Sequence, residues 1–249
     1  MNTNVIIKSA LIVIFILSIG FQSNAQIKLK TIDASVDAGV DLVSRYVWRG
    51  SDFGDSPAFQ PSVSISKGGF TLGSWGSFST NSSGLREVDL FLSYNYKDIV
   101  SLTLTDYFVA GPGIPFNNYF EYKNSLTNHV YEVSANLGGI KNIPLSLLIA
   151  TNFYGADAKK ADGKIAYSTY IELKYSHKSI DIFAGYNATN PNTDLIGSGY
   201  YAEKAGFVNV GCTVTRKIKL TSKYSLPLAV SLITNPISEN IFLVAAISL

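Results

Sequence analysis

The stretch REVDLFLSYNYKDIVSLTLTDYFV, residues 86–109, contains two runs in which apolar and polar side chains alternate. In the first run Val88 and Leu90 share one face, and Glu87 and Asp89 share the other. Successive side chains of a β-strand point to opposite faces, so a period of two predicts a strand with one apolar and one polar face. A short Lys-Asp step joins the two runs, and together they predict an antiparallel hairpin.

The same pattern continues from Ser35 to Leu249 in segments of about ten residues, each ending in turn residues. It predicts an all-β fold, a transmembrane antiparallel up-and-down β-barrel of about 12 strands, with ten or fourteen strands as alternatives. An even number is the rule for bacterial single-chain barrels. The predicted strands are Ser35–Arg49, Phe59–Lys67, Phe70–Ser79, Arg86–Tyr96, Ile99–Val109, His129–Leu137, Ile143–Tyr154, Ile165–Ser176, Ile180–Asn190, Gly206–Arg216, Tyr224–Thr234 and Asn240–Leu249.

The connections between these strands alternate in length, as in outer-membrane barrels with short periplasmic turns and longer extracellular loops. The short connections are Lys67–Gly69, Lys97–Asp98, Gly138–Asn142, His177–Ser179 and Lys217–Lys223. The longer ones are Gly50–Ala58, Thr80–Leu85, Ala110–Asn128, Gly155–Lys164 and Pro191–Ala205. Because the short class falls at every even-numbered strand end, we expect both termini in the periplasm.

The N-terminal region has the order of a secretory signal peptide: a positive charge, an apolar run at Ala10–Phe21, and small residues before Gln26. A transmembrane anchor is the alternative, but the run is shorter than the roughly 20 residues that a spanning helix needs. We therefore predict three parts: a cleaved signal peptide over residues 1–25, a short periplasmic segment over 26–34, and an outer-membrane barrel domain over 35–249. This predicts the outer membrane of a Gram-negative bacterium.

Composition excludes several classes of function. The formal net charge is +2 and is spread along the chain, which argues against a nucleic-acid partner. Cys212 is the single cysteine, so no disulfide forms within one chain. The sequence carries no motif for a metal, a phosphate or another cofactor, and none is expected.

Polar residues on the inward face of the predicted strands are the candidate functional residues. Charges of both signs across a narrow channel set its selectivity. The alternative is that the arginines pair with acidic neighbours and fill the interior, since a twelve-stranded barrel lies between small filled barrels and wide porins. The pore-lining candidates are Asp37, Asp41, Arg45, Arg49, Glu87, Asp89, Glu132, Glu172, Lys174 and Asp181.

Aromatic residues gather near the predicted strand ends and predict two interfacial girdles. The outer girdle is predicted to contain Tyr46, Trp48, Phe108 and Phe153, and the inner one Tyr94, Tyr96 and Tyr175. The aromatic-rich loop Ala110–Asn128 has three alternatives: a constriction folded inward, a surface for sugar stacking, or a loop packed on the barrel rim.

Three stretches of the first quarter of the mature chain carry a family resemblance: VDLVSRYVWRG (Val40–Gly50), SPAFQP (Ser56–Pro61) and GSWGS (Gly73–Ser77). In these stretches the chain resembles the TorF porin family. The resemblance implies an outer-membrane barrel with a pore role, and it implies no catalytic or ligand-binding residues.

The expected function is a porin-like channel for passive diffusion of small hydrophilic solutes, with outer-membrane lipid as the surrounding partner and an unassigned oligomeric state. A closed structural or surface-binding barrel is the first alternative. An outer-membrane lipid hydrolase is the second, because His177 and Ser179 have the spacing of a His-activated serine. We expect no enzymatic activity, because these two residues fall in a predicted short turn.

Overall fold

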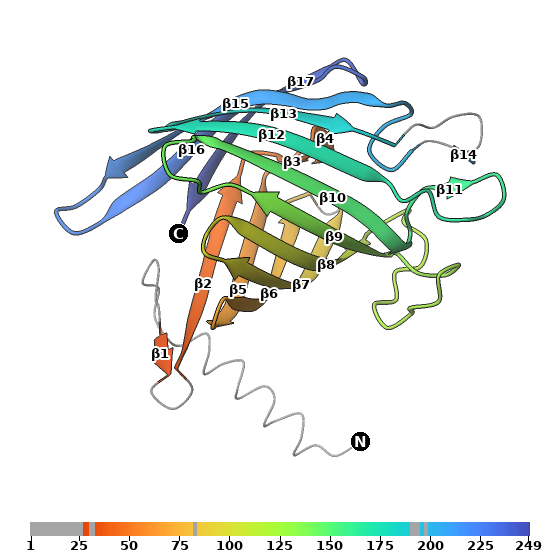
Figure 1. Cartoon of the computed structure of the whole chain (residues 1–249), viewed down its shortest axis with the longest axis horizontal. Helices are drawn as coiled ribbons and strands as arrows, with labels where there is room; N and C mark the ends of the chain where they lie inside the picture. The colour runs from red at the N-terminus through yellow and green to blue at the C-terminus, as the bar shows by residue number, and fades with distance from the viewer. Residues whose placement is uncertain (1–26, 30–32, 82–83, 190–194, 197–198) are drawn as a thin grey trace.

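The protein folds as a closed antiparallel barrel of twelve strands, so the predicted fold class is confirmed (Figure 1). The computed structural model describes residues 27–29, 33–81, 84–189, 195–196 and 199–249. Each strand pairs with its sequence neighbours in the barrel, and β2 pairs with both β5 and β17 to close the wall. The barrel strands are β2 (Ala34–Val43), β5 (Ala58–Lys67), β6 (Phe70–Ser79), β7 (Arg86–Tyr96), β8 (Val100–Ala110), β9 (His129–Leu137), β10 (Leu145–Gly155), β12 (Thr169–His177), β13 (Ile180–Asn187), β15 (Gly206–Lys219), β16 (Ser225–Asn235) and β17 (Asn240–Ser248).

The alternating pattern divides the wall into an outer apolar face and an inner polar face. On β7 the even-numbered Val88, Leu90 and Leu92 are exposed, whereas Glu87 and Asp89 are each only 5% exposed. Registered partners of an antiparallel pair have their side chains on the same face. The polar face is therefore continuous around the inside, and the exposed apolar face suits lipid.

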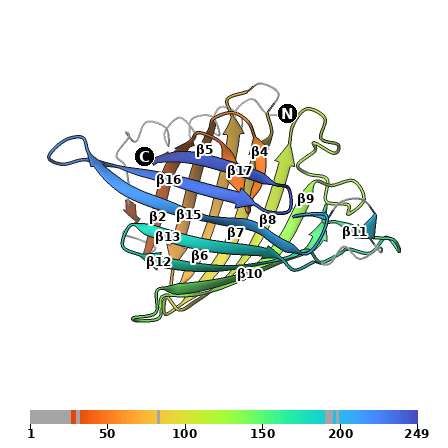
Figure 2. The same cartoon turned by 90° about the horizontal axis from the view of Figure 1, so that it is seen from above.

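The two ends of the barrel differ in their connections. One end, here called the turn end, carries the tight connections, of which the shortest, with two residues each, join β5 to β6 and β12 to β13. The other end, the loop end, carries the long connections, including two short strands, β11 (Lys159–Lys160) and β14 (Leu195–Ile196), that pair with each other (Figure 1). The β15–β16 hairpin extends beyond its neighbours at the turn end (Figure 2).

The seam between β2 and β17 is the shortest pairing in the wall. Only Asp41–Val43 are in register with β17, and mutual backbone hydrogen bonds between Val40 and Leu249 extend the pairing. The short strand β1 (Ile27–Leu29) pairs with β2 at Ala34–Val36. The alternating C-terminal segment thus closes the barrel.

The first predicted strand is too long at its outer end. The prediction ran to Arg49, but β2 ends at Val43 and the following residues form a separate hairpin of β3 (Tyr46–Trp48) and β4 (Ser51–Gly54). Tyr46 and Trp48 continue the apolar alternation, so the period alone does not separate the two segments. The hairpin lies inside the barrel, between its walls (Figure 1).

Two further observations concern the membrane predictions. In the part of the chain that the structure describes, no helix has the length and apolar character to span a bilayer. The predicted signal peptide, residues 1–25, lies outside the described residues, and so do residues 26 and 30–32 of the predicted periplasmic segment 26–34.

Candidate functional site

The β3–β4 hairpin reverses direction through Arg49 and Gly50, which both have positive φ angles, of 49° and 78°. Positive φ at both central positions is typical of the two-residue turns whose twist matches that of the flanking strands. A Cβ atom on Gly50 would lie 1.7 Å from the backbone oxygen of Val208 on β15. The turn is therefore pressed against the wall, and glycine is needed both for the φ angle and for the close approach.

Arg49 is the centre of the site. Its Nη1 and Nη2 atoms donate to the two carboxylate oxygens of Glu132 on β9, at 2.5 and 2.9 Å, and Nη1 also donates to the Tyr201 hydroxyl at 2.6 Å. The side chains of Arg49 and Glu132 are 9% and 1% exposed. A two-fold contact of this kind fixes both the distance and the plane of the guanidinium group. The ion pair thereby connects the hairpin to the opposite wall.

Aromatic rings surround the guanidinium group. Its carbon lies 4.4 Å from the ring centre of Trp48, 4.7 Å from that of Tyr170 and 5.5 Å from that of Tyr201. The negative ring faces attract the cation, and this attraction is strongest where water is excluded. The Tyr107 hydroxyl on β8 donates to Glu132 at 3.1 Å. Side chains from the hairpin, β8, β9, β12 and the segment before β15 thus meet across the lumen.

The network continues along the wall toward the turn end. The Tyr170 hydroxyl donates to Glu172 Oε2 at 2.5 Å, and Asn209 Nδ2 donates to both, at 3.0 and 2.9 Å. Each buried polar group is thereby given a partner, which limits the cost of its removal from water. Glu172 is the last member, and it borders the open inner part of the lumen.

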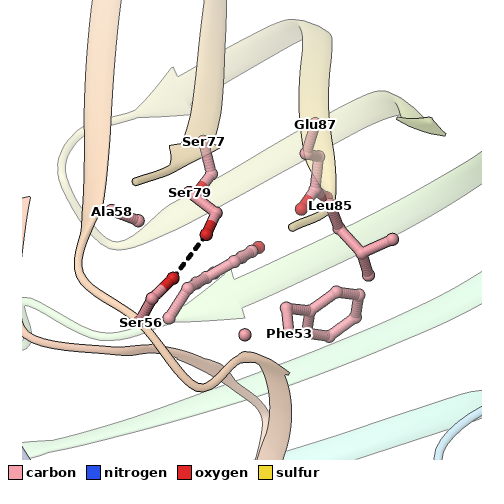
Figure 3. A pocket seen from close by; sticks show the side chains of 9 residues that line it. Phe53, Ser56, Ala58, Ser77, Ser79, Leu85 and Glu87 are labelled. Carbon is pink, nitrogen blue, oxygen red and sulfur yellow. Dashed lines mark hydrogen bonds between the residues drawn. The ribbon is translucent and has the colours of Figure 1, made fainter. Parts of the chain in front are cut away.

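The other side of the hairpin packs on β6 and β7. The Tyr46 ring lies 5.5 Å from that of Trp75. Figure 3 shows side chains that line a small cavity between Phe53 of the hairpin and β6 and β7, where the Ser56 and Ser79 hydroxyls share a 2.5 Å hydrogen bond. Glu87 borders the same cavity, and its Oε2 atom has no hydrogen-bond partner among the described residues.

The lumen beyond the hairpin, toward the turn end, contains a cavity of about 240 Å³. Hydroxyl and amide side chains form most of its wall. The lining residues are Ser101, Thr103, Ser134, Asn136, Ser146, Leu148, Glu172 and Lys174. We call this space the turn-end chamber. Nearer the loop end, the hairpin and its aromatic partners occupy part of the lumen, beside a second space of about 490 Å³ that borders Gly50, Asp52 and Tyr201.

The strand pairings place the predicted pore-lining residues of the barrel strands on the inner, polar face of the wall. Asp37 pairs with Ser64, Asp41 with Gln60 and Asp181 with Thr213. Glu87 pairs with Ser77, Asp89 with Trp75 and Glu132 with Thr105. Glu172 and Lys174 line the turn-end chamber.

Of the ten candidates, the structure joins Arg49 directly to Glu132, while Arg45 pairs with Asp52 of β4 at 3.4 Å. Tyr107, Tyr170, Tyr201 and Asn209 belong to the site but were not predicted. A strand pattern marks inward positions without showing which of them meet. Tyr201, which contacts Arg49 across 152 positions, lies before β15 and outside any strand pattern.

The aromatic girdle prediction needs correction at the outer end. Tyr46 and Trp48 point into the lumen, because the chain leaves the wall after Val43. Phe108 is 6% exposed, since its ring packs against Tyr119 of the Ala110–Asn128 loop. That loop is therefore packed on the rim, which was one of its three predicted arrangements. The other predicted girdle residues, Phe153, Tyr94, Tyr96 and Tyr175, are exposed.

His129 anchors this loop on the outside of the wall. Its ring is fully buried, with Nδ1 2.7 Å from Asp106 Oδ1 and Nε2 2.6 Å from the backbone oxygen of Tyr119. Partial burial and then the Asp106 charge raise the pKa of the Tyr119 hydroxyl. Among the described residues, no cluster of His, Cys, Asp and Glu is arranged to bind a metal ion.

His177 and Ser179 lie at the β12–β13 turn, as the sequence predicts. His177 ends β12 and Lys178 has a positive φ of 55°. The His177 ring stacks on Tyr175 at 6.4 Å between centres. This turn is at the opposite end of the barrel from the long loops.

Comparisons with known proteins give one family and one similar structure. The family model described as "Bacterial protein of unknown function (Gcw_chp)" matches residues 31–161, more than half of the chain. A solved structure titled "KdgM porin" is similar at 11% sequence identity and a TM-score of 0.45, with 85% of this chain and 97% of that chain covered. No curated protein matches the sequence. The chain belongs to the Gcw_chp family of bacterial proteins of unknown function.

Proposed function

We propose that this protein is an outer-membrane channel for passive diffusion of small hydrophilic solutes, and that the β3–β4 hairpin limits its conductance. The observation that carries the proposal is a closed barrel with a polar inner face, in which one hairpin lies within the lumen near the loop end and is held there by the Arg49–Glu132 pair. The wall is continuous without this hairpin, because no barrel strand pairs with β3 or β4 in the described sheet. Displacement of the hairpin would join the turn-end chamber to the outside.

Two further points support the channel. The three stretches that resemble the TorF porin family fall within the region that matches the Gcw_chp family. The first of them, Val40–Gly50, includes β3 and the turn at Arg49 and Gly50. The exposed apolar outer face is what a barrel in the outer membrane requires.

The test is solute efflux from liposomes that contain the folded protein. Arg49→Ala removes the ion pair, so the hairpin loses its connection to β9. We expect a small neutral sugar to leave these liposomes at least about tenfold faster than those with the parent protein, since closing contacts of a few kcal/mol are lost. Equal efflux from both proteins, at the level of empty liposomes, would contradict the proposal.

A closed structural or surface-binding barrel is the second candidate. The buried Arg49–Glu132 pair with its aromatic surround favours it, because such a network suits a permanently filled interior. Deletion of the hairpin separates the two functions: a channel then conducts, whereas a barrel with other internal fillings stays closed. For the lipid-hydrolase alternative, the relevant residues are His177 and Ser179, which lie at the β12–β13 turn.

A further inference from the structure

Carboxylates dominate the inner face of the barrel, although the whole chain has a formal charge of +2. Seven acidic side chains lie on this face of the described barrel strands. They are Asp37, Asp41, Glu87, Asp89, Glu132, Glu172 and Asp181. Among the described strands, Lys174 is the one cation on the same face at a position that is paired with strands on both sides.

The remaining nearby cations do not offset this charge. Arg49 and Arg45 belong to the segment inside the barrel, and they already pair with Glu132 and Asp52. Lys217 and Lys219 have the inward parity of β15. They lie beyond Val214, where the pairing of β15 with β13 ends, in the part of the β15–β16 hairpin that projects from the barrel. The charge that remains along the lumen is therefore negative.

Two of these carboxylates are also left without full hydrogen bonding. Glu87 and Asp89 are each 5% exposed, and Glu87 Oε2 and Asp89 Oδ1 have no partner among the described residues. Both side chains sit on the inner face of β7, at positions i and i+2. A buried carboxylate oxygen without a partner is costly, and a cation that passes or binds beside it lowers that cost.

We propose that the lumen is selective for small cations and excludes anions. This inference rests on the proposed channel function and names its class of solute. A channel wall with one sign of charge concentrates counter-ions and repels ions of its own sign. Asp37, Asp41 and Asp181 contribute most in an open channel, because the structure pairs none of them with a cation among the described residues.

The first experiment measures ion selectivity in planar bilayers across a KCl gradient. The background is Arg49→Met with Glu132→Gln, which removes one charge of each sign and so leaves the charge balance of the lumen unchanged. We expect K⁺ to permeate at least about threefold better than Cl⁻. Adding Asp37→Asn, Asp41→Asn and Asp181→Asn should bring the ratio to about one.

The matched control neutralises three carboxylates outside the lumen. Glu121→Gln, Asp162→Asn and Glu239→Gln change the net charge of the chain by the same amount, but these side chains lie in loops. The K⁺ preference should survive in this control. A channel that prefers Cl⁻, or a preference that the loop control abolishes equally, would overturn the inference.

A second experiment works even if the channel never opens. Ser134 lines the turn-end chamber, so Ser134→Cys in a Cys212→Ser background places one thiol inside the lumen. We expect a trimethylammonium methanethiosulfonate reagent to modify it at least about tenfold faster than a sulfonate reagent, relative to Ser125→Cys in a loop. If no conductance is seen in the bilayer but the cationic reagent still reacts faster, the channel proposal is rejected and the inference of a cation-selective chamber is kept. Equal rates, or faster modification by the anion, would reject the inference itself.

Discussion

Glu132 compensates the charge of Arg49 inside the barrel, and both side chains are removed from water. Breaking a buried ion pair by removing one partner leaves an uncompensated charge, which typically costs about 3–5 kcal/mol. We expect Glu132→Gln to lower the free energy of unfolding by about 3 kcal/mol, measured by denaturant titration with tryptophan fluorescence. The exposed pair between Asp162 and Lys164 is the control: Lys164→Gln should leave stability unchanged. Equal effects of the two changes would show that the Arg49 contact is not structural.

A substitution at Gly50 tests whether the turn of the hairpin lies against β15. Gly50→Ala meets both a positive φ and the backbone oxygen of Val208, whereas Gly113→Ala meets the same φ of 78° with no atom within 4 Å. The difference between the two variants isolates the close approach from the backbone strain. We expect Gly50→Ala to be less stable than Gly113→Ala by at least about 2 kcal/mol in the same denaturant titration. Equal losses would mean that the hairpin does not touch β15.

At the scale of elements, the sequence predicts wall strands better than it predicts the hairpin. The wall strands follow from local alternation, since one face meets lipid and the other meets water. Tyr46 and Trp48 keep the same alternation inside the barrel, but there their rings pack against other aromatic rings instead of facing lipid. The contact of Arg49 with Glu132 joins residues 83 positions apart, and no local pattern contains that information.

The β2–β17 seam is the element where we expect the wall to open first. It has three registered pairs, whereas β15 and β16 share ten. Local opening is easiest where few backbone hydrogen bonds must break. Amide hydrogen exchange followed by mass spectrometry should therefore be at least about tenfold faster at Asp41–Val43 than at the centre of β15. Slower exchange at the seam than in β15 would contradict this account of the closure.

At the scale of the whole molecule, charge and loop length both distinguish one end of the barrel from the other. The turn end projects Lys217, Lys219 and Lys223 on the β15–β16 hairpin and its turn, and the loop end carries the long connections. Alternation of loop lengths was enough to predict this polarity from the sequence. The sequence predicted the charged inward positions one by one, but not the net negative charge of the inner face. That net charge depends on Arg45 and Arg49, which lie after β2 and outside the wall strands.

The polarity gives a test of orientation in intact cells. In a Cys212→Ser background, Gly163→Cys places a thiol in a loop and Ser222→Cys places one in the β15–β16 turn. If the loop end faces outward, a membrane-impermeant maleimide labels Gly163→Cys in whole cells and Ser222→Cys only after lysis. Labelling of both positions in intact cells, or of the turn position alone, would reverse or reject the proposed orientation.

The most direct test of the central claim is single-channel conductance of the folded protein in a planar bilayer, with the parent compared with Arg49→Ala and with Arg86→Ala. Arg49 holds the hairpin across the lumen, whereas Arg86 is an exposed residue at the start of β7. The account predicts rare, small openings in the parent and in Arg86→Ala, and frequent larger openings in Arg49→Ala. A folded, inserted Arg49→Ala protein that stays silent would contradict the claim that this hairpin closes a channel.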